Sequence, residues 1–210
     1  MSTIERAVER LLDDGSGYLP RADARRNVER LVTAAREAAA ELGDQVTAHE
    51  IARRAGVGVG TFYRRVGSLE TLLHAVLDEV LGEITAKADE ALADDDPWAG
   101  FTAFASAYIR LRNELCDINE TLGDVLGDAR DGLRDRIRRL VRRAQKAKVM
   151  RTDVSWEDVA FLLVGVTRPD HTMGLHAGEL QWERNLQIML DGLRTPQPSR
   201  LPGRPLRAQA

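Results

Sequence analysis

The chain has 210 residues, of which 43% are hydrophobic and 30% are charged, and its formal net charge is -3. These values are ordinary for a soluble globular protein of one medium domain or of two smaller ones. They exclude a wholly basic nucleic-acid binder, and no run of apolar residues approaches the roughly 18 that a membrane span needs. The single cysteine, Cys116, excludes an intrachain disulfide and fits a reducing compartment.

The first twenty residues contain four acidic side chains and lack the apolar core of a signal peptide, so we expect a cytoplasmic protein. A metal site needs several His, Cys or acidic residues at a set spacing. Four scattered histidines and one cysteine offer no such set. We therefore predict neither a metal nor a cofactor.

The charge is distributed unevenly along the chain. Residues 21–66 contain nine arginines and six acidic residues, a net charge of +3, whereas residues 67–210 carry nineteen basic and twenty-three acidic residues. A mildly basic segment on an acidic body is consistent with one end that faces DNA.

Apolar residues recur at three- and four-residue spacing throughout, and no useful strand-like alternation is present, so the sequence predicts an all-α fold. Residues 1–20 have an amphipathic pattern that would either dock on the body or fray. A first long helix should end at Gly43, as a helix does before a C′ glycine. Thr47 and Glu50 match the S/T-x-x-E capping box, so Thr47 is the expected N-cap of a short helix that ends at Gly56.

The apolar pattern after residue 67 predicts five more helices. One follows Ser68, and the next starts at Pro97, a residue suited to a first helical turn. Another spans about 133–144, and Ser155 is the expected N-cap of the fourth. A loop rich in helix-breaking residues precedes the last helix, and the Pro- and Arg-rich tail 195–210 is predicted to be disordered.

The stretch AGVGVGTFYRRV, residues 55–66, carries three glycines followed by a hydroxyl, two aromatic rings and two arginines. A phosphate-binding loop is one interpretation. A dinucleotide loop, however, needs a preceding strand and a glycine at the position of Thr61, and a P-loop needs a lysine that this segment lacks. The sequence offers a capped helix instead of the strand.

A helix-turn-helix explains the same residues. Gly56 can adopt the left-handed conformation that ends the first short helix. Gly60 destabilises a helix by roughly 1 kcal/mol relative to Ala, which makes sense if the backbone must approach a ligand closely. Phe62 and Val66, four residues apart, fall on one face and would anchor the second helix to the core.

The segment TAHEIARRAGVGVGTFYRRVGSLETLL, residues 47–73, resembles the DNA-binding segment of the TetR family of bacterial regulators. Its fixed positions fit the family pattern closely, and the preceding residues resemble the family's first helix. Residues 153–166 and 182–194 resemble, more loosely, the last two helices of many actinobacterial members. The matching positions are Thr47, Ile51, Ala52, Ala55, Gly56, Val57, Gly60, Thr61, Phe62, Tyr63, Arg65, Glu70 and Leu72 or Leu73.

Three positions depart from the family pattern. Gly58 replaces the usual Ser or Thr cap, and Val66 replaces a Phe, which should loosen the packing under the recognition helix. Leu69 replaces a Lys that commonly touches phosphate. The departures remove one cap and put one backbone contact in doubt.

The resemblance implies a domain plan. We expect an N-terminal extension that is partly disordered (1–20), a helix-turn-helix DNA-binding domain (21–68, motif 47–66), a helical ligand-binding and dimerisation domain (69–194), and the tail (195–210). It further implies a homodimer that binds a near-palindromic operator and acts as a repressor released by a small-molecule effector. Half-sites would lie about 34–36 Å apart or somewhat more. No membrane partner is expected.

Roles on the DNA follow from the resemblance. Thr47, Thr61 and Tyr63 would contact phosphates, and Val59 and Gly60 would face base edges. Charge in the groove or at phosphates would come from arginines. The candidates are Arg64 and Arg65, with Arg21, Arg25 and Arg26 either reaching an adjacent part of the duplex or lying on a solvated helix start.

The candidate ligand-pocket and dimer-interface residues come from the helical second domain. For the pocket they are Trp98, Phe101, Phe104, Tyr108 and Cys116, although a packed core is the simpler explanation of each. For the interface they are Trp156, Val159, Leu163, Trp182, Leu186, Met189 and Leu190.

Two further features have ordinary explanations. The basic amphipathic segment 134–151 fits a solvated helix face, although it could hold an anion. His171 and His176 flank a Gly-containing loop, and we interpret them as ordinary loop histidines in preference to a metal or pH role.

Two other functions remain open. A ligand-binding or interaction module that has kept this fold without specific operator binding is the first, motivated by Val66 and Leu69. An enzyme is the second, but no paired carboxylates, nucleophile with a base or metal constellation supports it. We therefore predict a regulator rather than an enzyme.

Overall fold

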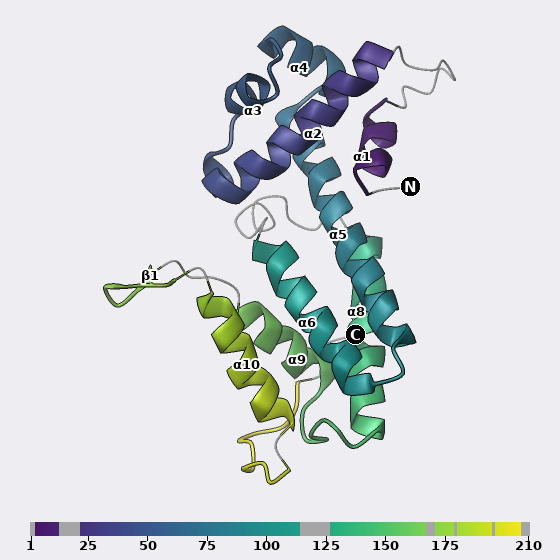
Figure 1. The fold of residues 1–210 in the computed structure, drawn as a ribbon, viewed down its shortest axis with the longest axis vertical. Coiled ribbons are helices and arrows are strands. Elements are labelled where there is room, and N and C mark those ends of the chain that lie inside the picture. Colours follow the sequence, from purple (N-terminus) through teal and green to yellow (C-terminus); the bar gives the residue numbers. More distant parts are fainter. Residues whose placement is uncertain are drawn as a thin grey trace. The chain divides into compact units, whose positions relative to one another are not determined.

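The structure is a computed structural model that describes residues 3–12, 22–113, 127–166, 171–178, 180–194 and 196–206. It is built almost entirely of α-helices, as the sequence predicts (Figure 1). Two compact units divide the chain, one formed by residues 1–83 and 114–129 and the other by residues 84–113 and 130–210. Helix α5 (Leu69–Ala93) contributes its first part to one unit and its second part to the other.

The first unit contains the predicted helix-turn-helix and is named the DNA-reading unit after that prediction. It consists of short and long helices around an apolar centre. They are α1 (Thr3–Leu12), α2 (Ala22–Leu42), the 3₁₀ turn η1 (Gly43–Gln45), α3 (Ala48–Arg54), α4 (Val59–Val66) and the start of α5. Helix α2 packs against α1, α3 and α4. The fully buried side chains of this unit include Val8, Val28, Leu31, Val32, Ile51, Phe62 and Leu72.

Local signals end and start these helices where the sequence predicts. Gly43 has a φ of 54° at the end of α2, a left-handed conformation that favours glycine. The Ser68 hydroxyl accepts a hydrogen bond from the Thr71 amide at 3.0 Å, which caps the start of α5. Helix boundaries therefore follow from short-range chemistry.

A buried ion pair joins α2 to α5 within the DNA-reading unit. Arg36 Nη1 lies 3.2 Å from Oε1 of Glu79 and 2.7 Å from Oε1 of Glu83. The Glu79 side chain has no exposed surface, whereas that of Arg36 is 22% exposed. Because a buried carboxylate is costly unless it is paired, this contact determines how α2 and α5 can pack.

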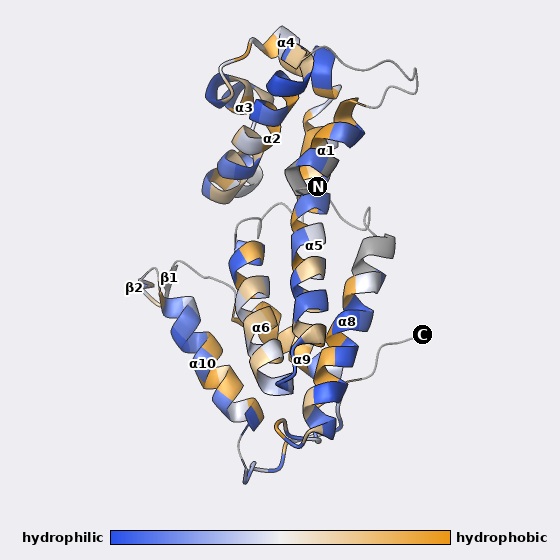
Figure 2. Cartoon of the chain, turned by 45° about the vertical axis from the view of Figure 1, so that its right-hand side comes forward, coloured by the Kyte–Doolittle hydropathy of each residue, from blue (hydrophilic) through white to orange (hydrophobic). Residues whose placement is uncertain are grey.

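The second unit contains the rest of α5, α6 (Pro97–Asn113), most of α8 (Gly127–Lys146), α9 (Trp156–Gly165) and α10 (Gln181–Arg194). Helix α6 packs against both α9 and α10. Gly100 in α6 lies so close to the Ala91 carbonyl that an added Cβ would collide with it. Figure 2 shows α8 in alternating blue and orange, as expected for an amphipathic helix.

Arginines of α8 hold this unit together from one side. Arg136 forms two hydrogen bonds with the Asp89 carboxylate, at 2.8 and 3.0 Å, and these lower the pKa of Asp89. Arg143 donates to the carbonyls of Ala91 and Leu92 at the end of α5 and to that of Asp94. A cation at a helix C-terminus satisfies carbonyls that lack helical partners. The basic segment is thus partly structural.

The loop before α10 contains a small hairpin that periodicity did not reveal. Strands β1 (His171–Thr172) and β2 (Leu175–His176) pair antiparallel, with His171 opposite His176. Met173 and Gly174 both have positive φ, 49° and 78°, as a two-residue hairpin turn requires. Within the described residues no group of three potential metal ligands is present.

The tail was predicted to be disordered, and its described part, residues 196–206, has no helix or strand. It nevertheless contacts the helical part of the second unit, to which it belongs. The Leu206 amide donates to Asp158 Oδ1 at 3.2 Å, and Arg151 donates to the Ser199 carbonyl at 2.9 Å. Among the described helices, none combines the length and the hydropathy that a bilayer crossing requires.

Candidate nucleic-acid interface

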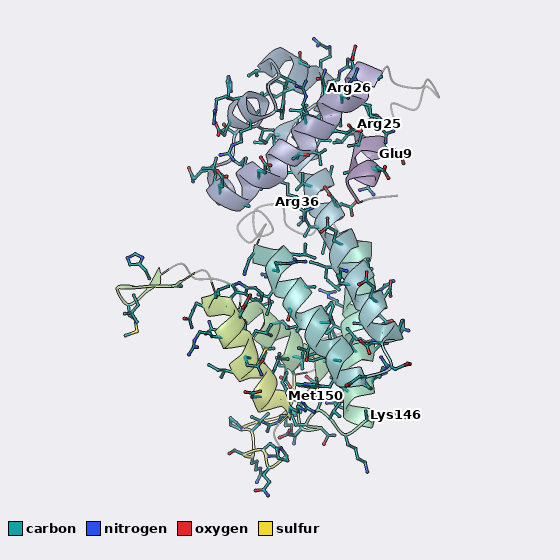
Figure 3. All side chains as sticks on the ribbon, in the orientation of Figure 1. Glu9, Arg25, Arg26, Arg36, Lys146 and Met150 are labelled. Atoms are coloured by element: carbon teal, nitrogen blue, oxygen red, sulfur yellow. The ribbon has the colours of Figure 1, made fainter. Side chains whose placement is uncertain are left out.

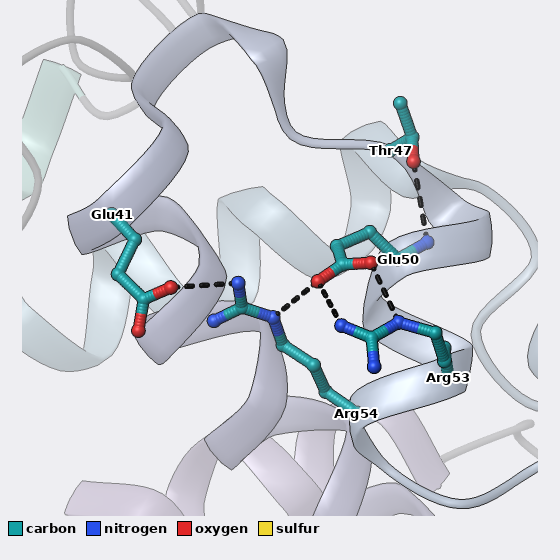
Figure 4. A network of polar contacts seen from close by, with 5 residues as sticks. All are labelled: Glu41, Thr47, Glu50, Arg53 and Arg54. Carbon is teal, nitrogen blue, oxygen red and sulfur yellow. Dashed lines mark hydrogen bonds and ion pairs between the residues drawn. The ribbon is translucent and has the colours of Figure 1, made fainter.

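Thr47 starts α3 as the sequence predicts. Its hydroxyl accepts a hydrogen bond from the Glu50 amide at 3.2 Å, so Thr47 is the N-cap. The reciprocal half of the predicted capping box is replaced, because the Glu50 carboxylate accepts hydrogen bonds from Arg53 and Arg54 instead (Figure 4). Glu50 therefore organises the arginines at the end of α3.

The turn between α3 and α4 is a Schellman motif. The Val57 amide donates to the Ala52 carbonyl at 3.0 Å and the Gly56 amide donates to the Arg53 carbonyl at 3.2 Å. Gly56 has a φ of 64°, a conformation that costs a side-chain-bearing residue about 1–2 kcal/mol. This explains the first of the three glycines, and the helix-turn-helix geometry follows from it.

Helix α4 presents one apolar face inward and one polar face outward. Phe62 and Val66 are buried. At 100° per residue, Gly60, Thr61 and Arg64 project on the opposite side. The outward side chains are linked, since Arg64 donates to the Thr61 hydroxyl at 3.1 Å.

Two further candidate residues lie beside this face, Tyr63 at its edge and Val59 nearer the buried side. The Tyr63 side chain is 49% exposed and packs edge-on against the Phe62 ring, with the ring centroids 5.2 Å apart. Val59 is half-buried at the start of α4. Tyr63 therefore offers a hydroxyl to a partner while its ring is oriented by the core.

Gly60 has no neighbour that would exclude a side chain. A Cβ added there would meet nothing within 4 Å, and the same holds for Gly58. The protein's own packing therefore does not demand glycine at position 60. A bare backbone on the outward face is instead what a closely approaching external partner would need.

The arginines of this unit differ in how their charge is balanced. Arg53 pairs with Glu50 at 2.7 Å, and Arg54 pairs with both Glu50 and Glu41 at 2.7 Å. Arg64 and Arg65, in contrast, form no ion pair among the residues that the structure describes. Arg64 and Arg65 therefore place uncompensated positive charge on α4, next to the outward face.

Hydrogen bonds from Arg53 and then Arg54 lower the pKa of the Glu50 carboxyl from 4.5 to about 2. The pKa values of Arg53 and Arg54 are raised in turn. For Arg53 the main cause is the hydrogen bond to Glu50. For Arg54 it is the hydrogen bond to Glu41, followed by the one to Glu50. The cluster stays fully ionised at neutral pH and presents paired rather than free cations.

The start of α2 carries the other predicted DNA contacts, labelled in Figure 3. Arg25 pairs with Glu29 at 3.0 Å and Arg26 pairs with Asp23 at 2.6 Å. Both pairs are exposed, so their strength is modest and a phosphate could replace either carboxylate. Arg21 lies outside the described residues.

Comparison with known proteins identifies the fold and the motif. Residues 31–76 match the family model described as "Bacterial regulatory proteins, tetR family", and residues 98–195 match "Transcriptional regulator SbtR-like, C-terminal domain". A TetR transcription regulatory protein from Mycobacterium vanbaalenii is 30% identical, with a TM-score of 0.58, over 83% of this chain and 99% of that one. This chain belongs to the TetR family.

A second TetR-family structure is similar to this one. It is a TetR transcriptional regulator from Streptomyces coelicolor, 27% identical with a TM-score of 0.60, and the match covers 81% of this chain and 99% of that chain. No curated protein sequence matches significantly. The TetR-family motif thus coincides with α3, the turn and α4.

The three departures from the TetR pattern have visible consequences. Gly58 is the N-cap of α4 and makes no side-chain cap hydrogen bond. Val66 is 4% exposed and is, with Phe62, one of two buried side chains in α4. Leu69 is half-buried at the start of α5, where a lysine head group would instead lie in solvent.

The predicted ligand-pocket residues lie along α6. Phe101 and Phe104 are fully buried and belong to the core of the second unit, whereas Trp98 and Tyr108 are half-buried. Trp98 stacks near Phe101, and Arg194 lies 5.4 Å from the Trp98 ring centroid. Cys116 lies outside the described residues.

The predicted dimer-interface residues differ in burial within the single chain. Four of them are buried: Val159, Leu163, Leu186 and Leu190, all at most 4% exposed. Trp156, Trp182 and Met189 are half-buried. Apolar periodicity marks the inward face of a helix, whichever neighbour that face meets.

The exposed apolar residues of α9 and α10 were missed by sequence reasoning. Phe161 is 69% exposed, Leu162 is 42% exposed and Ile188 is 70% exposed. Their signal in the sequence was an apolar run around α9, FLLVGV, that is longer than one helix face can bury. Arg30 was also missed. Arg30 is exposed on α2 beside the turn. A Cβ added at Gly56 would lie 3.7 Å from its Nη1 atom.

Proposed function

We propose that this TetR-family regulator binds a near-palindromic operator as a homodimer, represses transcription, and is released by a small-molecule effector. The observation that carries the DNA-binding part is the outward face of α4. There Gly60, Thr61 and Arg64 stand together, with the charge of Arg64 uncompensated within the described residues. Such a face fits the major groove, where an α-helix can enter.

The roles on DNA follow the geometry of the unit. Thr47 at the N-terminus of α3, and Thr61 and Tyr63 on α4, offer hydroxyls to phosphates. Arg64 and Arg65 offer charge to the groove or to phosphates. Val59 and the bare backbone at Gly60 would approach base edges, where a methyl can read thymine.

The apolar surface of the second unit supports the homodimer. Phe161, Leu162 and Ile188 are exposed side chains whose burial would be favourable. An isologous contact through α9 and α10 would cover them in both protomers at once. The interface we propose is therefore formed by these residues, and the four buried residues named above support it from inside.

Effector release requires that the ligand bind more tightly to the form that cannot hold DNA. The half-buried rings of Trp98 and Tyr108 on α6 are the candidates for ligand contact, because their partial exposure leaves surface for a bound molecule. Phe101 and Phe104 are buried in the core, so they would support such a site from behind Trp98 and Tyr108.

Selection of random duplex DNA by the purified protein tests the proposal. We expect enrichment of an inverted repeat by the native chain, loss of enrichment for Tyr63→Ala, and retention of the repeat with lower affinity for Tyr63→Phe, which removes only the hydroxyl. A folded dimer that enriches no sequence at low salt would contradict the proposal. It would support the alternative, a ligand-binding or interaction module of the same fold.

The salt dependence of binding supplies a second test. Each phosphate contact contributes a slope of about -0.9 in log K against log salt. Arg64→Ala should therefore reduce the slope, whereas Arg134→Ala, a matched change in the second unit, should leave it unchanged. Equal slopes for the two variants would exclude Arg64 from the interface.

A further inference from the structure

Helix α1 lies outside the segments that match the family models, yet it is packed into the DNA-reading unit. Val8 has no exposed surface and Ala7 is 6% exposed, whereas Glu9, labelled in Figure 3, is exposed. Helix α1 contacts both α2 and α4. An amphipathic helix with a fully buried valine is an integral part of the core around it.

A polar contact adds a third neighbour. Arg10 on α1 forms an ion pair with Asp78 on α5. Helix α1 is thus held by α2 and α4 through packing and by α5 through charge. Asp78 lies in the part of α5 that belongs to this unit, so α1 connects the recognition helix to the helix that leads out of that unit.

The recognition helix α4 has few supports of its own. It has eight residues, starts at Gly58 without a side-chain cap, and contains Gly60. Isolated helices shorter than about 12–15 residues are marginal in water, so tertiary packing must stabilise α4. Only two of its side chains, Phe62 and Val66, are buried, and Val66 is small.

We propose that α1 is a positioning element for α4, and that Val8 is the residue through which it acts. Helix α4 is weakly anchored because Val66 is small and the start of the helix has no side-chain cap. In the proposed role, packing against α1 restricts the motion of α4. A binding surface works only if its side chains are held within about 0.5 Å and 10–20° of the productive geometry. Helix α1 would therefore raise operator affinity without touching DNA.

Two variants of the full chain and one control test this role. Val8→Ala removes part of the packing, Val8→Asp places a charge in the buried position, and Glu9→Ala changes the neighbouring exposed residue. The first readout is amide hydrogen exchange without DNA. We expect exchange in α4 to accelerate about tenfold in Val8→Asp and less in Val8→Ala, with a much smaller change in α3 and none for Glu9→Ala.

The second readout is affinity for duplex DNA, and its interpretation rests on the proposed function. A parallel loss of affinity, about tenfold for Val8→Asp, is expected if α4 enters the groove. If the native chain binds no specific sequence, the proposed function fails, but the exchange readout still decides the role of α1.

Three results would overturn the proposal. Exchange in α4 could be the same in Val8→Asp as in Glu9→Ala. Helices α3 and α4 could lose protection equally in Val8→Ala, which would mean that α1 supports the whole unit and not α4 in particular. Finally, affinity could fall while exchange in α4 is unchanged, which would indicate that α1 acts at the DNA directly.

Discussion

Arg36 on α2 donates a hydrogen bond to Glu79 on α5 over 3.2 Å, and the Glu79 side chain is completely buried. The two residues are 43 positions apart in the sequence. The same guanidinium binds Glu83 through two further hydrogen bonds, at 2.7 and 3.1 Å. The interaction joins α2 to α5 within the DNA-reading unit.

Removal of Arg36 should strongly destabilise this unit. Loss of one partner of a buried ion pair costs about 3–5 kcal/mol, because the remaining charge is left uncompensated. We expect Arg36→Ala to lower the free energy of unfolding accordingly, and Arg26→Ala, which breaks an exposed pair, to change it by at most about 1 kcal/mol. Amide hydrogen exchange in α2 measures the stability of this unit. Tryptophan fluorescence would not report on it, because all three tryptophans lie in the other unit.

The double variant Arg36→Met with Glu79→Leu provides the decisive comparison. Apolar replacement of a whole buried pair is often close to neutral. If the double variant is as unstable as Arg36→Ala, packing at these positions and not the uncompensated charge explains the loss.

The ionisation of Glu50 predicts how acid affects the arginine cluster of α3. Arg53 and Arg54 lower its pKa from 4.5 to about 2, so the folded state holds the proton less tightly than the unfolded state. The stabilising contribution is complete above pH 4.5 and is lost as the pH falls toward 2. The advantage of the native chain over Glu50→Gln should therefore shrink across this interval.

Carboxyl NMR titration checks the assignment directly. The Glu50 resonance should titrate near pH 2 in the native chain and closer to 4.5 in Arg53→Ala. A native midpoint near 4.5 would show that the hydrogen bonds to Arg53 and Arg54 do not persist in solution.

Gly60 should show opposite effects on stability and on DNA binding. Nothing lies within 4 Å of an added Cβ, and Ala is about 1 kcal/mol better than Gly inside a helix, so Gly60→Ala should stabilise the DNA-reading unit by up to that amount. The same methyl would stand between the backbone and DNA. We expect weaker duplex binding by this more stable variant.

Gly132→Ala in α8 is the matched control for Gly60. Its added Cβ meets only the end of the Arg136 side chain, at 3.5 Å. This variant should be stabilised without loss of DNA affinity. Unchanged duplex binding by Gly60→Ala would mean that position 60 does not approach the partner closely.

Phe161 and Ile188 should determine the oligomeric state. Each is about 70% exposed in the single chain. A glutamate at either position would place a charge in the proposed interface, and its burial would be costly. We expect Phe161→Glu and Ile188→Glu to be monomeric in sedimentation experiments, and Leu42→Glu, a change at an exposed leucine of the other unit, to remain dimeric.

A dimeric Phe161→Glu variant would place the interface elsewhere on the chain. Loss of the dimer in Leu42→Glu as well would point instead to general unfolding. Far-UV circular dichroism distinguishes these cases, because helix content survives a simple dissociation.

The sequence by itself determined the helix ends and the motif between them. Thr47 and Ser155 cap helices through their own hydroxyls, and Gly43 and Gly56 end helices through positive φ. These features depend on atoms a few residues apart. Local chemistry of this kind is the same before and after the chain folds, so a sequence pattern is enough to predict it.

Only the tertiary structure decided which apolar residues stay exposed and which charges are paired. The apolar run in α9 has no single polar face, so periodicity could not separate Val159 and Leu163, which are buried, from Phe161 and Leu162, which are exposed. The contact between Arg36 and Glu79 and the docking of α1 likewise depend on segments far apart in the sequence. Burial is a property of the neighbours that folding brings together, and no short pattern records which neighbours those are.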